Sequence, residues 1–195
     1  MVDGEVLAET EKVLYEVEDN LARITLNRPD KLNAMDPETY QALSEAWIEV
    51  RDDPEVWAVI VTGAGDRAFS AGADLEKTIS PGEQEWDSFW RTQEGMILNN
   101  GLEMWKPVIA AVNGYCLAGG MTMLLATDIR IAGVDASFGL SEVKRGILPG
   151  NGGTQRTIRQ LPYPIAMEML LTGDRVDAET AHQWGLVNEV VESDE

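Results

Sequence analysis

The stretch at residues 106–120 reads KPVIAAVNGYCLAGG and sets the pattern for the rest of the chain. Residues 107–112 are a short apolar run, which predicts a buried strand. Asn113-Gly114 predicts a turn, and small residues then lead to Gly119-Gly120. These glycines begin an apolar segment, residues 118–126, which we expect to be a short helix. The stretch therefore predicts a strand, a tight loop and a helix in succession.

A similar succession occurs upstream, where an apolar strand at residues 56–61 leads into a small-residue loop at residues 66–74. The other elements that the patterns predict are a hairpin (13–17 and 21–26), helices (36–51, 82–100, 154–160, 164–171 and 178–184), a Gly/Pro-rich loop (146–153) and strands (128–132 and 186–191). Strands that alternate with helices predict an α/β protein whose sheet is largely parallel.

Composition excludes several classes of protein. The 195 residues carry a net charge of −19, which would repel nucleic acid, and any anion site must be built locally from backbone N–H groups and a few cations. No apolar run reaches the roughly 18 residues that a membrane span needs. One cysteine allows no internal disulfide, and one histidine makes a zinc site a poor expectation. A reducing cytoplasm is the simplest setting for a single cysteine, and no metal is expected.

One motif is misleading. VIVTGAGDRA, at residues 59–68, fits the glycine fingerprint of dinucleotide-binding folds. That fingerprint needs a helix to begin at its glycines, but here the chain continues as another small-residue loop. No strand ending in an acidic residue follows about 20 residues later, as the fingerprint also requires. A nucleotide-dependent oxidoreductase is therefore disfavoured.

The two small-residue loops suggest a ligand site. Gly119 and Gly120 begin a helix, so their N–H groups lack intrahelical partners and lie at its positive end. Two N–H groups aimed at one point could form an oxyanion hole, which stabilises a negatively charged oxygen. Tight turns without a function explain the same composition equally well, so the residues alone leave both interpretations open.

Taken together, the motifs resemble those of the crotonase (enoyl-CoA hydratase/isomerase) family over nearly the whole chain. The resemblance rests on the order and spacing of NRP (27–29), KLNAM (31–35), AFSAGADL (68–75), KPVIAAVNGY (106–115), AGG (118–120), FG (138–139), SE (141–142), GILPG (146–150), GGTQR (152–156) and LTG (171–173). It implies one domain over residues 1–195, folded as a spiral of ββα units. Relatives form trimers or hexamers through C-terminal helices, which we expect this chain to lack.

The resemblance also implies a function. Family members act on acyl-CoA thioesters, in which CoA is part of the substrate and no separate cofactor is needed. The N–H groups of Ala73 and Gly119 would hold the thioester oxygen and stabilise an enolate. Backbone around Leu32, Ala34, Ala71, Asp74, Leu75 and Glu76 would contact CoA. Many relatives have a lysine where this chain has Glu76, and Lys77 comes one residue later.

Glu142 matches the second catalytic glutamate of the family and is the expected acid and base. On its own, a glutamate in this loop could be a solvated carboxylate. The first catalytic glutamate is replaced by Thr122, whose hydroxyl can hold water but cannot accept a proton near neutral pH. The substitution Thr122→Glu should raise the rate of crotonyl-CoA hydration, provided that the pocket has room for water beside position 122.

Three activities stay open at this point. The first is a hydro-lyase or isomerase of fatty acid metabolism that uses Glu142. The second resembles the hydroxycinnamoyl-CoA hydratase-lyases, which also keep only the second glutamate, although they use a tyrosine where this chain has Thr78. The third is a catalytically impaired protein that only binds CoA esters.

Overall fold

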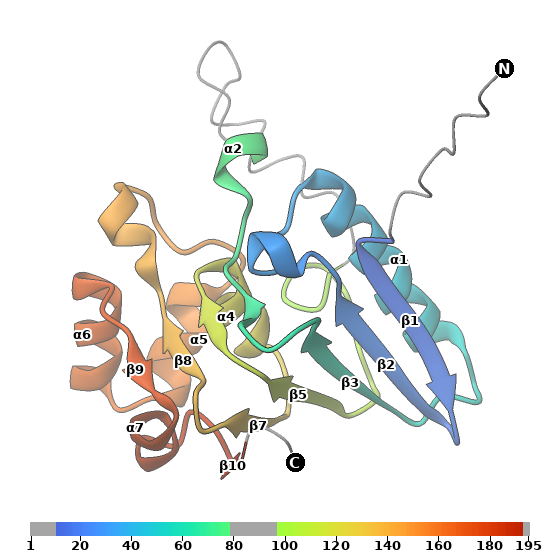
Figure 1. Ribbon diagram of the computed structural model, residues 1–195. Coiled ribbons are helices and arrows are strands. Elements are labelled where there is room, and N and C mark those ends of the chain that lie inside the picture. The colour runs from blue at the N-terminus through green and yellow to red at the C-terminus, as the bar shows by residue number, and fades with distance from the viewer. Residues whose placement is uncertain (1–10, 79–96, 193–195) are drawn as a thin grey trace, which may run out of the picture.

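The framework of the protein is a pair of sheets, seen in a computed structural model that describes residues 11–78 and 97–192 (Figure 1). The larger sheet has the strand order β1-β2-β3-β5-β7-β10. Its strands are β1 (Val13–Glu18), β2 (Leu21–Leu26), β3 (Ala58–Gly63), β5 (Val108–Val112), β7 (Ile129–Gly133) and β10 (Glu189–Val191). β1 pairs antiparallel with β2, and the other neighbours pair in parallel, as the sequence predicted.

The N-terminal hairpin is confirmed in detail. Asp19 and Asn20 connect β1 to β2 with φ values of 49° and 65°. Two successive left-handed residues are typical of the turns that join two twisted antiparallel strands, and Asp and Asn tolerate this conformation better than most residues.

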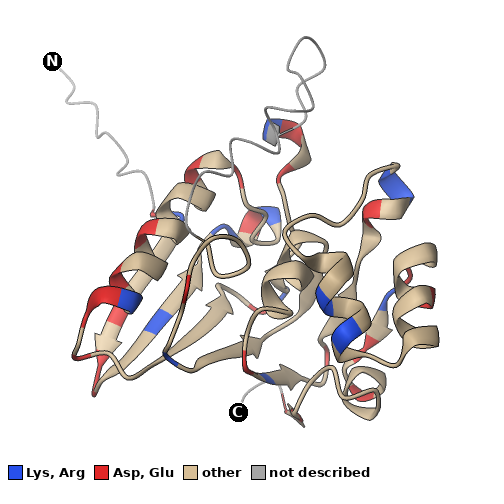
Figure 2. Ribbon diagram, turned by 180° about the vertical axis from the view of Figure 1, so that it is seen from behind, with Lys and Arg blue, Asp and Glu red and all other residues tan. Residues whose placement is uncertain are grey.

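Helix α1 (Pro37–Asp52) covers β1 and β2. The side chain of Asp36 caps it by accepting from the backbone N–H of Thr39 at 2.9 Å. Leu43, Trp47 and Val50 are fully buried on its inner face. The acidic residues of α1 are exposed on its outer face, and red segments mark them along the helix (Figure 2).

A second, four-stranded sheet has the order β4-β6-β8-β9. Its strands are β4 (Ala68–Ser70), β6 (Tyr115–Leu117), β8 (Ser137–Gly139) and β9 (Val176–Asp177). The first three run parallel, and β9 is antiparallel to β8. This sheet was not predicted, and residues 66–74 were expected to form a loop, because strands of two or three residues are too short to show alternation.

The remaining helical elements are η1 (Pro29–Lys31), α2 (Leu75–Thr78), α4 (Gly119–Leu124), η2 (Ser141–Arg145), α5 (Gly153–Gln160), α6 (Tyr163–Thr172) and α7 (Ala178–Gln183). The three helices expected near the C-terminus are confirmed to within one or two residues. None of the described helices has the length and hydrophobicity needed to cross a membrane.

Most of the helix expected over residues 82–100 lies outside the described ranges. Its residues 82–96 include Trp86, Phe89 and Trp90, for which the sequence left an acyl pocket and ordinary core packing equally open. The last four residues of that segment form a turn closed by a bridge between Ile97 and Asn100, so the helix does not extend to Asn100.

Candidate active site

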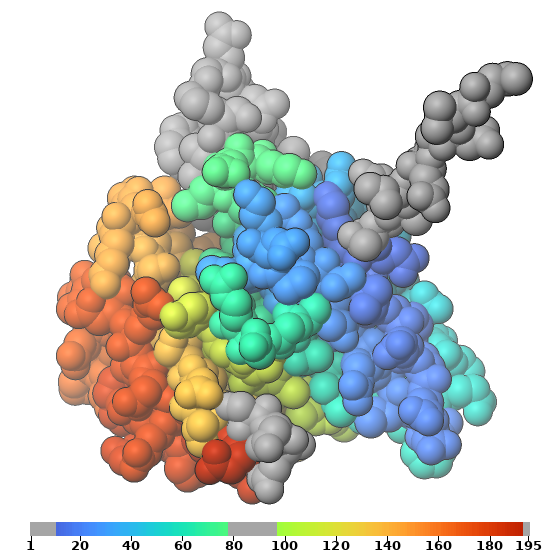
Figure 3. Space-filling view, in the orientation of Figure 1, coloured from blue at the N-terminus to red at the C-terminus, as the bar shows by residue number. Residues whose placement is uncertain are grey.

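The carboxyl ends of β4, β6 and β8 bring the motif residues together. These parallel neighbours pair Ser70 with Cys116 and Leu117 with Gly139, so the segments that follow them emerge at one edge of the small sheet. The backbone N–H of Ala118 also donates to Gly139 O at 2.9 Å. The space-filling view shows a hollow between the orange segment after β8 and the green segment after β4 (Figure 3). Crevices at this end of parallel strands are common ligand sites.

Ala73 and Gly119 face each other across a very narrow gap. A Cβ placed on Gly119 would lie 3.4 Å from the backbone nitrogen of Ala73. A Cβ on Gly72 would lie 2.6 Å from the nitrogen of Gly119, and Gly72 also has a φ of +91°. Any side chain at position 72 would therefore cover the Gly119 N–H. Within the described residues, neither the Ala73 nor the Gly119 N–H donates to a backbone or side-chain acceptor.

The residue before Gly119 is strained. Ala118 has a φ of 48° and a ψ of −118°, a conformation that non-glycine residues rarely adopt. It precedes the first residue of α4, so the chain bends sharply and presents the Gly119 N–H outside the helix. Strain of this kind costs about 1–3 kcal/mol and is concentrated at functional sites.

The expected CoA-binding segments also lie side by side. The N–H of Ala71 donates to Leu32 O at 2.9 Å, and Leu32 has a left-handed backbone with a φ of 53°. Further along, the N–H of Met35 donates to Gly72 O at 2.8 Å, and the N–H of Asp74 donates to Met35 O at 2.9 Å. The segment that holds Leu32 and Ala34 is thus bound directly to the loop that carries Ala73.

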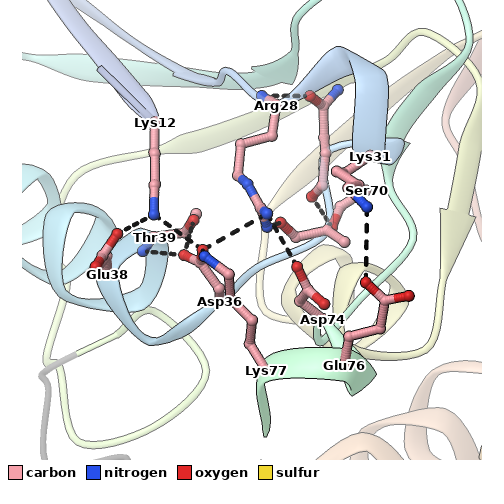
Figure 4. Close-up of polar contacts among 12 residues, drawn as sticks. Lys12, Arg28, Lys31, Asp36, Glu38, Thr39, Ser70, Asp74, Glu76 and Lys77 are labelled. Atoms are coloured by element: carbon pink, nitrogen blue, oxygen red, sulfur yellow. Dashed lines mark hydrogen bonds and ion pairs between the residues drawn. The ribbon is translucent and has the colours of Figure 1, made fainter. Parts of the chain in front are cut away.

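Ion pairs join the same two segments (Figure 4). The Arg28 guanidinium donates from Nη2 to Asp74 Oδ2 at 2.9 Å and lies 3.6 Å from Asp36 Oδ2. Lys12 and Lys77 each donate to Asp36 Oδ2 at 2.9 Å. We call Lys12, Arg28, Asp36, Asp74 and Lys77 the ion cluster. It fixes the start of α1 and the loop around Ala73 relative to each other.

The ion cluster keeps Asp36 ionised although its side chain is fully buried. Burial by itself would raise the pKa of Asp36, but hydrogen bonds from Lys12, Lys77 and Thr39 outweigh it and hold the pKa well below its usual range. Leu75 and Glu76, in contrast, begin α2 on the surface, where Glu76 pairs loosely with Lys31 at 3.7 Å. The expected contribution of Glu76 to binding is therefore through its backbone.

Glu142 is a buried carboxylate in a very different setting. It lies in η2, three residues after β8, and is 7% exposed. Its Oε2 atom has no hydrogen-bond partner among the described residues. Burial raises the pKa of Glu142 from 4.5 to about 7. A carboxyl group with this pKa can both accept and donate a proton near neutral pH.

Thr122 lies one turn after Gly119 in α4, as predicted, but its side chain is engaged elsewhere. Its hydroxyl donates to Ala118 O at 3.2 Å, and the residue is 2% exposed. Gly153, at the start of α5, packs so closely that a Cβ there would lie 3.0 Å from Thr122 Oγ1. The structure leaves little room for water beside Thr122.

Tyr40 is a residue of this site that the sequence patterns did not reveal. It fell within the helix predicted over residues 36–51, and its hydroxyl lies 3.3 Å from the Cβ position of Gly119. Burial and the charge of Glu142 raise the pKa of Tyr40 to about 12. A tyrosine on the inner stripe of a helix was the available signal, because a phenol in such a place usually finds a polar partner.

The described residues contain no group of three or more His, Cys, Asp or Glu side chains arranged to hold a metal ion. The buried thiol of Cys116 is held in its neutral form, because burial raises its pKa. Among the described side chains around this site, Glu142 is the carboxyl group whose pKa is raised to about 7.

Comparison with known proteins defines the class of this site. The family profile described as enoyl-CoA hydratase/isomerase matches residues 16–195. An (E)-benzylidenesuccinyl-CoA hydratase from Thauera aromatica is 44% identical over 180 residues, covering 92% of this chain and 70% of that protein. A carnitinyl-CoA dehydratase from Salmonella enteritidis is 45% identical over 175 residues, covering 90% of this chain. The chain spans only 66% of that dehydratase.

Solved structures with hydratase names also match this chain, in both fold and sequence. A carnitinyl-CoA hydratase from Mycobacterium avium superposes with a TM-score of 0.83 at 46% identity, covering 93% of this chain and 69% of that one. An enoyl-CoA hydratase from Bacillus anthracis gives a TM-score of 0.85 at 34% identity, covering 94% of this chain and 71% of that one. The chain belongs to the enoyl-CoA hydratase/isomerase (crotonase) family. The expected fold is confirmed, as is membership of an enzyme family whose named relatives are hydratases and dehydratases.

Proposed function

We propose that this chain forms the active site of a hydro-lyase that adds water to the double bond of an enoyl-CoA thioester, or removes it in reverse. The observation that carries the proposal is a buried Glu142 whose Oε2 has no partner among the described residues and whose charge acts on Tyr40. The Tyr40 hydroxyl in turn lies beside Gly119 and the Ala73 nitrogen, whose N–H groups are unpaired within the described residues. The names of the relatives support hydration and dehydration over C–C cleavage.

In the proposed reaction the thioester oxygen accepts hydrogen bonds from the Ala73 and Gly119 N–H groups. Water attacks the β-carbon while the Glu142 carboxylate takes one of its protons. The electron pair of the double bond moves to the thioester oxygen as an enolate, which the two N–H groups stabilise. Glu142 then delivers its proton to the α-carbon, and the enolate collapses to the hydroxyacyl thioester.

The structure supports Glu142 as the group that performs both proton transfers. Its pKa of about 7 means that both protonation states are populated at neutral pH. A second carboxylate is absent at position 122, and Thr122 is occupied by Ala118 O and Gly153. We therefore propose a mechanism with one carboxylate, in which CoA takes part only as a portion of the substrate, bound by backbone at residues 32–34 and 71–76.

The acyl group is the least defined part of the substrate. The relatives named above act on benzylidenesuccinyl-CoA and carnitinyl-CoA, whose acyl groups carry charged substituents. A panel of enoyl-CoA esters should therefore include crotonyl-CoA, a cationic γ-trimethylammonium analogue and an aryl-substituted ester. Loss of the enoyl thioester absorbance measures hydration, and detection of an aldehyde product would reveal C–C cleavage instead.

The test is Glu142→Gln, which keeps the shape of the side chain but removes proton transfer. We expect turnover to fall by roughly 10²–10⁴-fold while calorimetry shows unchanged binding of a saturated acyl-CoA. The matched control is Glu179→Gln, on the exposed face of α7, which should leave both quantities unaltered. Turnover by Glu142→Gln that equals that of the parent would remove Glu142 from the mechanism.

A further inference from the structure

Tyr40 lies beside the proposed oxyanion hole but has no role in the reaction described above. Its hydroxyl lies 3.3 Å from the point where a Cβ on Gly119 would stand, and the backbone nitrogen of Ala73 lies 3.4 Å from the same point. The Gly119 nitrogen is attached to the Cα that carries this point. The phenol oxygen and both proposed oxyanion-hole nitrogens therefore surround one small space between α1, α4 and the loop after β4.

The position of Tyr40 is fixed from its own helix. Tyr40 lies one turn after Asp36, and its backbone N–H donates to Asp36 O at 2.9 Å. Asp36 is in turn held by the cations of the ion cluster. The ion cluster thus anchors the start of α1 on one side and the Ala73 loop on the other, which sets the phenol against the two N–H groups.

The chemistry of the phenol suits hydrogen-bond donation. Among the described residues the Tyr40 hydroxyl has no hydrogen-bond partner, and the side chain is half-buried beside the site. Burial and the charge of Glu142 raise its pKa to about 12, so it stays protonated at every working pH. A neutral O–H held in a site shielded from water can stabilise a developing negative charge more strongly than it would in water.

We propose that the Tyr40 hydroxyl is a third donor to the thioester oxygen, beside the N–H groups of Ala73 and Gly119. The inference rests on the proposed function, because it assigns Tyr40 to the enolate of that reaction. Tyr40 keeps its proton throughout, and Glu142 performs both proton transfers. Tyr40 is then a catalytic residue in a chain that has threonine in place of the first glutamate.

Two reactions of the same enolate test this role. One is hydration of crotonyl-CoA, and the other is exchange of the α-protons of butyryl-CoA with D2O, followed by NMR. Exchange needs the oxyanion hole and Glu142 but no attacking water. Tyr40→Phe removes only the hydroxyl, and we expect it to slow both reactions by a similar factor, roughly 10²-fold, as for loss of one oxyanion-hole donor. The affinity for butyryl-CoA should change little.

Tyr15→Phe is the matched control. The Tyr15 hydroxyl is buried under α1 without a partner in the described structure, so its removal deletes the same atom away from the site. Both rates should stay at the parent level. Thermal unfolding of each variant shows whether the fold is intact, and the pH dependence of hydration shows whether Glu142 still titrates as in the parent.

Several results would overturn the inference. If Tyr40→Phe slows hydration but leaves exchange unchanged, the hydroxyl serves the attacking water and not the thioester oxygen. If Tyr40→Phe moves the pH optimum without lowering the maximal rate, the Tyr40 hydroxyl only shifts the pKa of Glu142. If neither rate changes, Tyr40 has no part in the reaction. If the parent catalyses neither reaction with the whole ester panel, the proposed function itself fails, and this is seen before any Tyr40 variant is made.

Discussion

Asp36 and Glu142 are both buried carboxylates, and their environments are opposite. Asp36 is fully buried yet surrounded by Lys12, Arg28 and Lys77, so its pKa is lowered. Glu142 is 7% exposed, has an unpartnered Oε2, and its pKa is raised to about 7. Burial raises the pKa of both, and the hydrogen bonds that Asp36 accepts from Lys12, Lys77 and Thr39 separate them.

The difference separates a structural carboxylate from a chemical one. Asp36 is compensated, so its charge is permanent and holds α1 against the Ala73 loop. No cation of the described residues compensates Glu142, so its charge is unstable at neutral pH, as the proposed proton transfer requires. A strongly shifted pKa marks a functional candidate only after its cause is known.

The largest expected effect comes from removing the charge of Asp36. Asp36→Asn keeps a good helix-capping residue but removes the buried carboxylate that Lys12, Arg28 and Lys77 share. We expect the free energy of unfolding in urea at pH 7 to fall by about 3–5 kcal/mol, as for other broken buried pairs. The difference in the free energy of unfolding should shrink as pH falls below about 4, where Asp36 begins to be protonated in the unfolded parent while the folded parent keeps it ionised. A group whose pKa is lowered by folding contributes its full stability only above its ordinary pKa. If Asp36→Asn and the parent were equally stable at pH 7, the charge of Asp36 in the ion cluster would contribute nothing to the stability of the fold.

Glu142→Gln should change the free energy of unfolding in the opposite direction, so that the variant is more stable than the parent at high pH. A raised pKa stabilises the fold below the ordinary value of 4.5, and this contribution is lost as pH rises through about 7. Glutamine never ionises, so the variant should be more stable than the parent at pH 8 by at most about 3 kcal/mol, and equally stable at pH 4. Urea unfolding at both pH values measures the difference in the free energy of unfolding between variant and parent. A gap that does not grow with pH would show that Glu142 is not buried as an uncompensated charge.

Thr122→Glu probes a third buried site. The sequence suggested that a glutamate here would restore the pair of catalytic carboxylates if the pocket had room for water. The packing of Thr122 against Gly153 removes that condition. We now expect the larger side chain to lower the free energy of unfolding by about 1–3 kcal/mol and to leave hydration of crotonyl-CoA no faster. A stable variant with faster hydration would show that α5 can move away from position 122.

The two sheets show what the sequence could and could not predict. The strands of the larger sheet are five or six residues long, apart from β10, and their apolar runs were readable. The strands that carry the site are two or three residues long, so no periodicity could reveal them. The motif residues at their ends were found through the family resemblance.

The ion cluster and Tyr40 were missed for a different reason. The helix predicted over residues 36–51 begins at its cap, Asp36, but the partners of this carboxylate are 24 and 41 residues away at Lys12 and Lys77. Tyr40 looked like one more apolar residue on the inner stripe of α1. Contacts between distant segments depend on register and packing, which single-sequence patterns do not encode.

The smallest expected effect comes from Glu38, which shares its cation with Asp36. Lys12 pairs with both carboxylates, but the side chain of Glu38 is 73% exposed and that of Asp36 is fully buried. Glu38→Gln should therefore change the free energy of unfolding by less than about 1 kcal/mol, as is usual for exposed ion pairs, and added salt should erase the change. A double-mutant cycle sharpens the contrast, because Lys12→Met should couple strongly to Asp36→Asn and only weakly to Glu38→Gln. Equal coupling energies would mean that burial does not set the strength of these pairs, and the distinction between Asp36 and Glu142 would then need another cause.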